Sequence, residues 1–353
     1  MRFAVGDRVA CRVGPAEWAR GAVVQLSYRE ETWPARRVAP YQILLDDGHL
    51  IFAPHDSDEL IRAEATFEKS LYKEEKESEA EISYREDVCA RYPRKNPALF
   101  EPSELPRFLS PPLRAALQSE DVNAALRTLW TEEARGLYSM PFFTSEFCEL
   151  LLDETEHFEL WCADAGVPLH RPNTMNNHGA ILDDFGMQPM MDALMRKCVQ
   201  PLALAAGYED VIGGDALCTH HAFLVAYALG KDLDLKFHVD SSDVTLNVCL
   251  GRTFEGGGLF FRGVRCRKHQ QTGCTTEDEH VTYHHKPGTA VLHRGHHRHG
   301  AHEITSGERC NLILWCRGDP ERGSSEGANK DHACQKWCWM HDTAGPSGGQ
   351  APG

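Results

Sequence analysis

The sequence predicts an α+β chain in which a double-stranded β-helix (jelly roll), buttressed by helices, follows a small N-terminal β-barrel. From Asp215 onward, short apolar stretches alternate with turns such as Gly256-Gly257-Gly258 and Pro287-Gly288, at the spacing typical of a jelly roll. Amphipathic periodicity earlier in the chain predicts the helices that cover it. We expect eight strands, near 219–228, 233–239, 243–250, 258–263, 280–285, 289–293, 297–302 and 309–316.

Residues 1–62 are predicted to form a small barrel of the SH3 or Tudor type. Apolar and polar residues alternate over five short stretches, and Asp46-Asp47-Gly48 is a hairpin turn signal. The aromatic residues of this region have two interpretations: a cage for a methylated lysine, or ordinary core and hairpin-rim packing, which is the more common role. These residues are Trp18, Tyr28, Trp33 and Tyr41.

Residues 63–136 are predicted to be an acidic, proline-containing helical linker region, because charge is dense up to Glu86 and prolines interrupt the stretch that follows. Helical periodicity returns over 119–135, and a strand is expected over 138–143. Thr144 or Ser145 can cap the next helix, and a further amphipathic helix is expected over 187–206. The main domain is predicted to span 137–318 and a flexible tail 319–353.

The composition argues against several classes of protein. The net charge of -15 opposes binding to phosphate backbones, so we expect no nucleic-acid partner. No apolar run approaches the length of a membrane span, and the N-terminus lacks the apolar region of a secretory signal. The 13 cysteines are odd in number and scattered, which predicts reduced thiols in a cytoplasmic or nuclear protein.

The tail contains a cluster of cysteine and histidine residues between His332 and His341. Two cysteines and two histidines could bind one zinc ion. The spacing is tight for a tetrahedral site, so a packed terminal segment is the favoured interpretation.

His238 and Asp240 are candidate metal ligands. Side chains alternate along a strand, so these two point the same way and supply two-thirds of a facial iron site, which needs a second histidine. The run from 293 to 302 contains five candidates for this second histidine: His293, His296, His297, His299 and His302. Arg309 shares a strand face with Asn311, Ile313 and Trp315, and an inward Arg309 would bind a dicarboxylate through a bidentate ion pair.

The spacing of these residues resembles that of 2-oxoglutarate- and iron(II)-dependent oxygenases of the prolyl and lysyl hydroxylase type. An H-x-D is followed by a histidine ten positions before the basic residue of a G-x-R. In that register His299 is the third metal ligand and Arg309 binds 2-oxoglutarate. The resemblance extends from about Leu137 to Arg317 through ordered blocks, which read RPNTMNNHGAIL, HHAFLVAYALGKDLDLKFHVD, VTLNVCLGRTFEGGGLFFRG, VLHRG and HGAHEITSGERCNLILWCR.

The resemblance implies an enzyme, a dioxygenase that uses Fe(II), 2-oxoglutarate and O2, with ascorbate as a candidate auxiliary reductant. It would release succinate and CO2 while hydroxylating a prolyl or lysyl side chain of a protein or peptide, through His238, Asp240, His299 and Arg309. Many prolyl hydroxylases hold the cosubstrate with a tyrosine where this chain has Cys249. Asn247 or Tyr227 is therefore expected to supply the second anchor, although Tyr227 is equally interpretable as a core hydroxyl.

Other residues near these motifs have two interpretations each. The amide-rich segment 171–178 either caps and turns, or lines the mouth of the site with its amides and Arg171. Trp315 is expected to pack as a floor under the site. His293, His296 and His297 are expected to be ordinary polar or loop residues, with substrate contact by one of them as the alternative.

Two other functions compete with this one. A nucleic-acid dealkylase of the AlkB type carries a second arginine six positions after the first, where this chain has Trp315, and its substrate disagrees with the acidic composition. A non-catalytic module, whose barrel reads a protein mark, is disfavoured because all four expected catalytic residues are intact.

Overall fold

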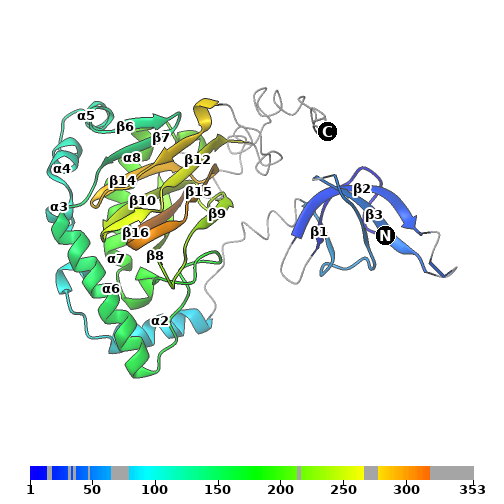
Figure 1. Ribbon diagram of the computed structural model, residues 1–353, viewed down its shortest axis with the longest axis horizontal. Coiled ribbons are helices and arrows are strands. Elements are labelled where there is room, and N and C mark those ends of the chain that lie inside the picture. Colours follow the sequence, from blue (N-terminus) through cyan, green and yellow to red (C-terminus); the bar gives the residue numbers. More distant parts are fainter. Residues whose placement is uncertain are drawn as a thin grey trace, which may run out of the picture. The chain divides into compact units, whose positions relative to one another are not determined.

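The computed structural model describes residues 1–13, 18–30, 33–34, 37–46, 48–64, 79–212, 216–265 and 277–318 (Figure 1). The chain divides into two compact units, Met1–Ile82 and Ser83–Gly353. The tail segment considered for zinc lies outside the described residues. None of the helices in the described ranges is both long enough and apolar enough to cross a membrane.

The first unit is a five-stranded antiparallel sheet with the strand order β4-β3-β2-β1-β5. Alternate residues face its core, including Val9 and Cys11 from β1 and Tyr41 and Ile43 from β3. The pairings of the described residues do not join β4 to β5, so closure into a barrel stays a prediction. The strands are β1 (Arg8–Arg12), β2 (Trp18–Tyr28), β3 (Ala39–Leu45), β4 (Leu50–Ala53) and β5 (Ile61–Ala63).

The four aromatic residues considered for a cage differ in their surroundings, and two of them, Tyr28 and Trp33, lie 5.7 Å apart between ring centroids. Tyr41 is fully buried, and its hydroxyl donates a hydrogen bond to the Asp56 carboxylate at 2.7 Å, so it is a core residue. Trp18 is instead covered by the guanidinium of Arg62. Tyr41 therefore follows the packing interpretation, and a cage that includes it is excluded.

The second unit begins with helices that pack into its core, where the sequence predicted a linker region. The chain is buried here because apolar residues between the charges and prolines, among them Val88, Leu99 and Phe108, all face the same cluster. The elements are α2 (Glu79–Arg91), η1 (Pro97–Phe100), η2 (Pro102–Glu104), α3 (Leu105–Phe108), α4 (Pro111–Leu117) and α5 (Val122–Leu129), followed by β6 (Thr131–Ala134) and β7 (Leu137–Pro141).

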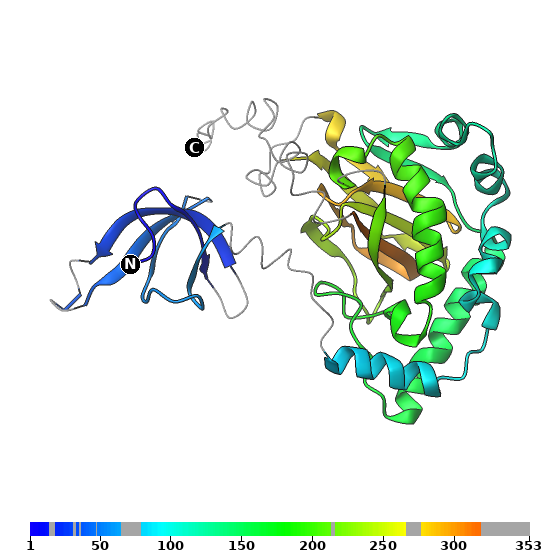
Figure 2. The ribbon, with the colours of Figure 1, turned by 180° about the vertical axis from the view of Figure 1, so that it is seen from behind.

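Longer helices then cover one side of a large sheet (Figure 2). Thr144 caps α6 as expected, because its hydroxyl oxygen accepts a hydrogen bond from the backbone N–H of Phe147. The helix predicted over 187–206 is continuous but contains a π-helical turn. The elements are α6 (Ser145–Ala165), η3 (Leu182–Phe185), α7 (Gln188–Leu194), η4 (Met195–Val199), α8 (Gln200–Ala205) and α9 (Glu209–Ile212).

Two facing antiparallel sheets form the jelly roll, and each of the eight predicted strands has a counterpart in them. One sheet has the order β11-β16-β10-β14-β7-β6, with β8 on the other edge of β16, and the second has the order β13-β12-β15-β9. The larger sheet contains β8, β10, β14 and β16, and the smaller sheet contains β9, β12, β13 and β15, which is the topology of a double-stranded β-helix. The strands are β8 (Leu217–Ala228), β9 (Leu235–His238), β10 (Val244–Gly251), β11 (Phe254–Gly256), β12 (Leu259–Val264), β13 (Val281–Tyr283), β14 (Thr289–Arg294), β15 (His297–Ala301) and β16 (Ile304–Gly318); η6 (Glu277–Glu279) precedes β13.

Strand alternation divides the residues of the two central strands between two environments. Leu246 and Val248 of β10, with Leu312 and Leu314 of β16, belong to the apolar core that the helices cover. The residues between them point to the opposite face, into the space between the two sheets. Most polar side chains of β10 and β16 are on that face, so the candidate site lies between the two sheets.

Buried histidines tie β8 to the helical layer and give a first prediction. The imidazole of His220 lies 3.2 Å from the carboxylates of both Asp183 and Asp192. Burial opposes its charge, but the two carboxylates outweigh burial and raise the pKa of His220. The adjacent His221 donates a hydrogen bond to the carbonyl of Pro172 at 2.9 Å, and burial lowers its pKa.

We expect His220→Gln to reduce the unfolding free energy by about 1.5–3 kcal/mol near pH 5.5 and by less near pH 8.5. A raised folded pKa stabilises below the unfolded pKa of about 6.5, and that contribution disappears as the pH rises. His221→Gln is the matched control with the opposite trend, a larger loss near pH 8.5 than near pH 5.5. The folded pKa of His221 is lowered, so in acid the unfolded chain binds a proton at this histidine more readily than the folded chain does, and the contribution of His221 to stability falls. Denaturant unfolding at the two pH values measures both, and equal losses for His220→Gln would contradict the assignment.

Candidate metal centre and anion pocket

Three of the predicted site residues converge between the sheets. His238 ends β9 and His299 lies in β15, and these two residues are direct partners in the strand pairing. Asp240 follows in the turn after β9. One potential ligand atom from each of the three residues lies within 4.8 Å of the other two. Among the described residues, this is the group of histidine, cysteine and acidic side chains that could hold a metal ion. The structure therefore brings together His238, Asp240 and His299, as the sequence predicted.

The distances suit a single metal ion. Asp240 Oδ1 lies 3.3 Å from His238 Nε2 and 3.6 Å from His299 Nε2. Two ligand atoms that are each about 2.1 Å from a metal and 90° apart lie about 3.0 Å from each other. The two separations exceed that value by about 0.3 and 0.6 Å.

Backbone carbonyls fix which nitrogen of each histidine faces the site. His238 Nδ1 lies 2.7 Å from the carbonyl oxygen of Lys236, and His299 Nδ1 lies 2.8 Å from that of His297. A carbonyl only accepts, so each Nδ1 carries the proton and each Nε2 presents a lone pair. This is the arrangement by which outer groups orient metal-binding histidines. Burial lowers the pKa of His299 to about 3, so that ring is neutral at pH 7.

Asp240 is held by its own set of contacts. Its Oδ2 accepts a hydrogen bond from the Thr245 hydroxyl at 2.7 Å, and its backbone N–H donates to the Gly295 carbonyl. Burial works against its charge, but the imidazoles of His299, His238 and His293 lower the pKa of Asp240. Gly295 is needed for this approach, because a Cβ there would lie 1.9 Å from the Ser242 carbonyl oxygen.

His293 and His297 are buried strand residues rather than loop residues. His293 Nδ1 bonds the Arg294 carbonyl, and its Nε2 lies 3.9 Å from Asp240 Oδ2 with no hydrogen-bond partner among the described residues. His297 is equally buried, behind Phe261. Their place on strands β14 and β15 corrects the expectation of loop residues.

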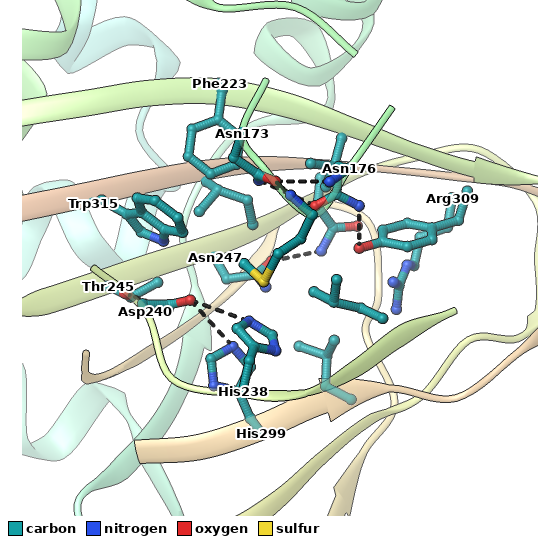
Figure 3. Close-up of a pocket in the computed structure, with 17 residues that line it drawn as sticks. Asn173, Asn176, Phe223, His238, Asp240, Thr245, Asn247, His299, Arg309 and Trp315 are labelled. Atoms are coloured by element: carbon teal, nitrogen blue, oxygen red, sulfur yellow. Dashed lines mark hydrogen bonds and ion pairs between the residues drawn. The ribbon is translucent and has the colours of Figure 1, made fainter. Parts of the chain in front are cut away.

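The metal-ligand group opens into a cavity whose empty volume, counting space open to solvent, is about 420 Å³ (Figure 3). Arg309 is the one Lys or Arg side chain in its lining. The cavity is lined by Asn173, Met175, Asn176, Phe223, Val225, Tyr227, Leu235, His238, Asp240, Thr245, Asn247, Leu259, His299, Arg309, Asn311, Ile313 and Trp315.

Arg309 points into this cavity from β16. Its side chain is 1% exposed, its guanidinium donates to the Gly257 carbonyl, and its Cζ lies 4.4 Å from the centre of the Tyr227 ring. No carboxylate pairs with it in the described part of the chain, and its Nε has no acceptor there. Desolvation lowers the pKa of Arg309. A buried cation without an anion is costly, so this end of the cavity suits an anionic ligand.

Polar side chains beside Arg309 extend this anion site. Asn311 Nδ2 donates to Asn247 Oδ1 at 2.6 Å and lies 2.9 Å from His285 Nδ1. The Asn311 Oδ1 atom and the His285 Nε2 atom are buried without partners among the described residues. Neither Asn311 nor His285 was predicted from the sequence as a site residue. Asn311 could have been found, because it lies two residues after Arg309 on the same strand face.

The remaining predicted residues divide between the cavity and the core. Tyr227 and Asn247 line the cavity, whereas Cys249 is buried and absent from its lining. Trp315 lines the cavity as well, and its indole N–H is buried without an acceptor in the described ranges. Segment 171–178 contributes three lining residues, but Arg171 is exposed and outside the lining.

Comparison with known proteins places this site in a family. Residues 88–213 match the OGFOD2-like domain. The Xenopus tropicalis protein named 2-oxoglutarate and iron-dependent oxygenase domain-containing protein 2 is 36% identical over 262 residues, which cover 73% of this chain and 71% of that protein. The chain belongs to the family of 2-oxoglutarate and iron-dependent oxygenase domain-containing protein 2.

Members of this family occur in plants as well. The Arabidopsis thaliana 2-oxoglutarate and iron-dependent oxygenase domain-containing protein ICU11 is 42% identical over 257 residues, or 72% of this chain, and the match spans 62% of that protein's length. Among solved structures, a Pseudomonas putida prolyl-4-hydroxylase has a TM-score of 0.35 at 15% identity, covering 57% of this chain and 97% of that one. The family name implies iron and 2-oxoglutarate, and the residues present fit both.

The metal site gives a second prediction. Asp240→Ala removes the one carboxylate ligand, so we expect binding of Mn(II), used as a redox-stable probe, to weaken more than about 100-fold while the fold persists. Isothermal titration calorimetry measures the affinity, and circular dichroism checks the fold. Asp234→Ala is the matched control, since Asp234 pairs with Lys236 outside the cavity lining. Unchanged Mn(II) affinity in Asp240→Ala would contradict the site.

Proposed function

We propose that this protein is an Fe(II)- and 2-oxoglutarate-dependent dioxygenase that hydroxylates a prolyl or lysyl side chain of a protein, with release of succinate and CO2. One observation carries the proposal: a buried arginine without a carboxylate partner among the described residues shares a cavity with two histidines and an aspartate. The arginine suits an anion, and the two histidines with the aspartate suit a metal ion. A dicarboxylate such as 2-oxoglutarate can chelate the metal with one end and pair with the arginine through the other. The family membership supports the same conclusion.

Each protein group has a definite task in this proposal. His238, Asp240 and His299 would hold Fe(II) at one face and leave the other positions open. The bound iron and 2-oxoglutarate supply O2 activation coupled to oxidative decarboxylation of the cosubstrate. Arg309 would bind the far carboxylate of 2-oxoglutarate, and the neighbouring amides Asn247 and Asn311 would complete its shell. The buried position of these groups excludes water from the anion.

The rest of the cavity supports a side chain as the substrate. Its walls include the apolar side chains of Phe223, Val225 and Ile313, which suit the methylenes of a proline or lysine. The unpartnered indole N–H of Trp315 is available to a carbonyl of the substrate. A lining with no second Lys or Arg side chain is poorly suited to phosphates, and we propose no nucleic-acid partner.

The remaining elements of the proposal follow from the chemistry. O2 is the oxidant, and ascorbate would keep the iron reduced between turnovers. A cytoplasmic or nuclear location would keep the protein's cysteines reduced. The match spans 62% of the length of the Arabidopsis relative. We therefore include the partners in the proposal: a protein substrate, and any partner of the N-terminal sheet.

Arg309 gives a third prediction: replacing it should weaken 2-oxoglutarate binding without reducing the stability of the ligand-free protein. Arg309→Met should abolish saturation by 2-oxoglutarate and leave the ligand-free protein as stable as the wild type or more so, because a buried unpaired cation is removed. Arg309→Lys should raise the KM for 2-oxoglutarate about 10–100-fold, since the bidentate contact is lost. Succinate release and thermal unfolding measure the two effects. A strongly destabilised Arg309→Met protein with normal KM would contradict the role.

The hydroxylation itself gives a fourth prediction. Peptides from cells that contain the wild-type protein should carry prolyl or lysyl hydroxylation that is missing in cells with Asp240→Ala, as measured by mass spectrometry. Succinate release by the purified protein, with added Fe(II) and 2-oxoglutarate, tests turnover independently of the substrate. Absence of any turnover, coupled or uncoupled, would favour a binding module instead.

A further inference from the structure

Residues 171–178, here called the strap, form one wall of the cavity and connect to its anion end. Three strap side chains line the cavity: Asn173, Met175 and Asn176. The strap is fastened at both ends by side chains of the jelly roll. His221 donates to the Pro172 carbonyl at 2.9 Å, and Asp232 accepts the backbone N–H of Asn177 at 2.8 Å.

Hydrogen bonds within the strap aim the amide of Asn176 in one direction. Asn173 Oδ1 accepts the backbone N–H groups of Met175 and Asn176, at 2.7 and 2.8 Å, which is an Asx-type turn. The Asn173 amide N–H then donates to Asn176 Oδ1 at 3.1 Å. Because the oxygen of Asn176 is used inside the strap, its Nδ2 is directed outward. That Nδ2 donates to the Tyr227 hydroxyl at 3.0 Å.

Tyr227 connects the strap to the anion site. Its ring lies under the Arg309 guanidinium, with 4.4 Å between Cζ and the ring centre. Tyr227 and Asn176 are 3% and 2% exposed, so water does not compete for their hydrogen bond. The phenol oxygen accepts from Asn176, and the described residues offer no acceptor for the hydroxyl proton. Burial raises the pKa of Tyr227, so the phenol keeps that proton.

We propose that Asn176 is a positioning residue, which turns the Tyr227 hydroxyl toward the carboxylate held by Arg309 and so couples 2-oxoglutarate binding to the strap. The inference rests on the proposed function and deepens it. With the anion bound, hydrogen bonds run from Asn173 through Asn176 and Tyr227 to the carboxylate. Such chains reinforce one another in a buried site.

The coupling has a consequence for the order of binding. The strap supplies part of the wall that the substrate side chain contacts, so cosubstrate that steadies the strap also prepares the substrate site. Linkage requires the effect to be reciprocal, and substrate must tighten 2-oxoglutarate binding by the same factor. Asn176 therefore acts on the cosubstrate through Tyr227 and on the substrate through the strap.

A double-mutant cycle in the full-length, Mn(II)-loaded protein tests the inference. Calorimetric titration with 2-oxoglutarate gives the Kd for wild type, Asn176→Ala, Tyr227→Phe and the double variant. We expect each single variant to weaken binding about tenfold. The double variant should be about as weak as either single variant rather than about 100-fold weaker, because both lose the same interaction. Independent, multiplicative losses, or a normal Kd for Asn176→Ala, would overturn the inference.

A second variant separates hydrogen-bond direction from mere packing. Asn176→Asp keeps the size of the side chain but can only accept, so the Tyr227 hydroxyl would turn to it and away from the cosubstrate. We expect Asn176→Asp to weaken 2-oxoglutarate binding at least as much as Asn176→Ala. Wild-type affinity in Asn176→Asp would show that only the shape matters and would overturn the proposal.

Asn177→Ala is the matched control, because the Asn177 side chain bonds Asp232 at 3.0 Å and lies outside the cavity lining. It removes one of the strap's hydrogen bonds to Asp232, keeps the backbone bonds to that residue and leaves the Asn176–Tyr227 bond intact, so the Kd for 2-oxoglutarate should change less than about twofold. A tenfold loss in this control would assign the effect to the strap in general and overturn the specific role of Asn176. If the wild type binds no 2-oxoglutarate, the proposed function fails first, and the inference falls with it.

Discussion

The pairing of β15 with β9 is the constraint on which this site depends. It sets His299 directly across from His238, so two residues sixty-one positions apart share one face of the smaller sheet. A register shift of one residue would turn one imidazole to the other face. Gly295 then lets the turn that carries Asp240 approach the neighbouring strand end. The metal-ligand group is thus a product of strand register and one close backbone approach.

The opposite end of the cavity has a different physical character. It collects polar atoms whose hydrogen-bonding capacity the described residues leave unused, including Arg309 Nε and Asn311 Oδ1. Burying such atoms without hydrogen-bond partners destabilises the folded chain. Their accumulation at one end of a cavity, opposite an equally incomplete set of metal ligands, indicates a site organised for a ligand. Stability and function therefore compete at Arg309.

Much of this architecture could be predicted from the sequence. Alternation of apolar residues and turn signals located eight of the nine strands from β8 to β16 and missed only the short β11, and the H-x-D and G-x-R spacings located the residues that converge. Closure of the N-terminal sheet was expected but depends on a pairing that local pattern does not specify. The packing of 83–117 was missed because charge and proline content conceal apolar residues such as Phe108, whose burial depends on contacts distant in sequence.

Side-chain networks were the least predictable feature. The role of Asn176 depends on which of its two amide atoms the strap uses, and only the folded loop decides that. His293 was equally hidden, because five histidines in ten residues give no sign of which face the metal site. Family resemblance selected His299, and the strand pairing supplies the physical reason.

The central claim is that His299, and not the neighbouring buried His293, completes the metal site. The most direct test compares Mn(II) affinity in His299→Ala and His293→Ala. The account predicts a loss of more than about 100-fold for His299→Ala and a loss of about tenfold or less for His293→Ala, as for an outer partner. The reverse order of losses would contradict it.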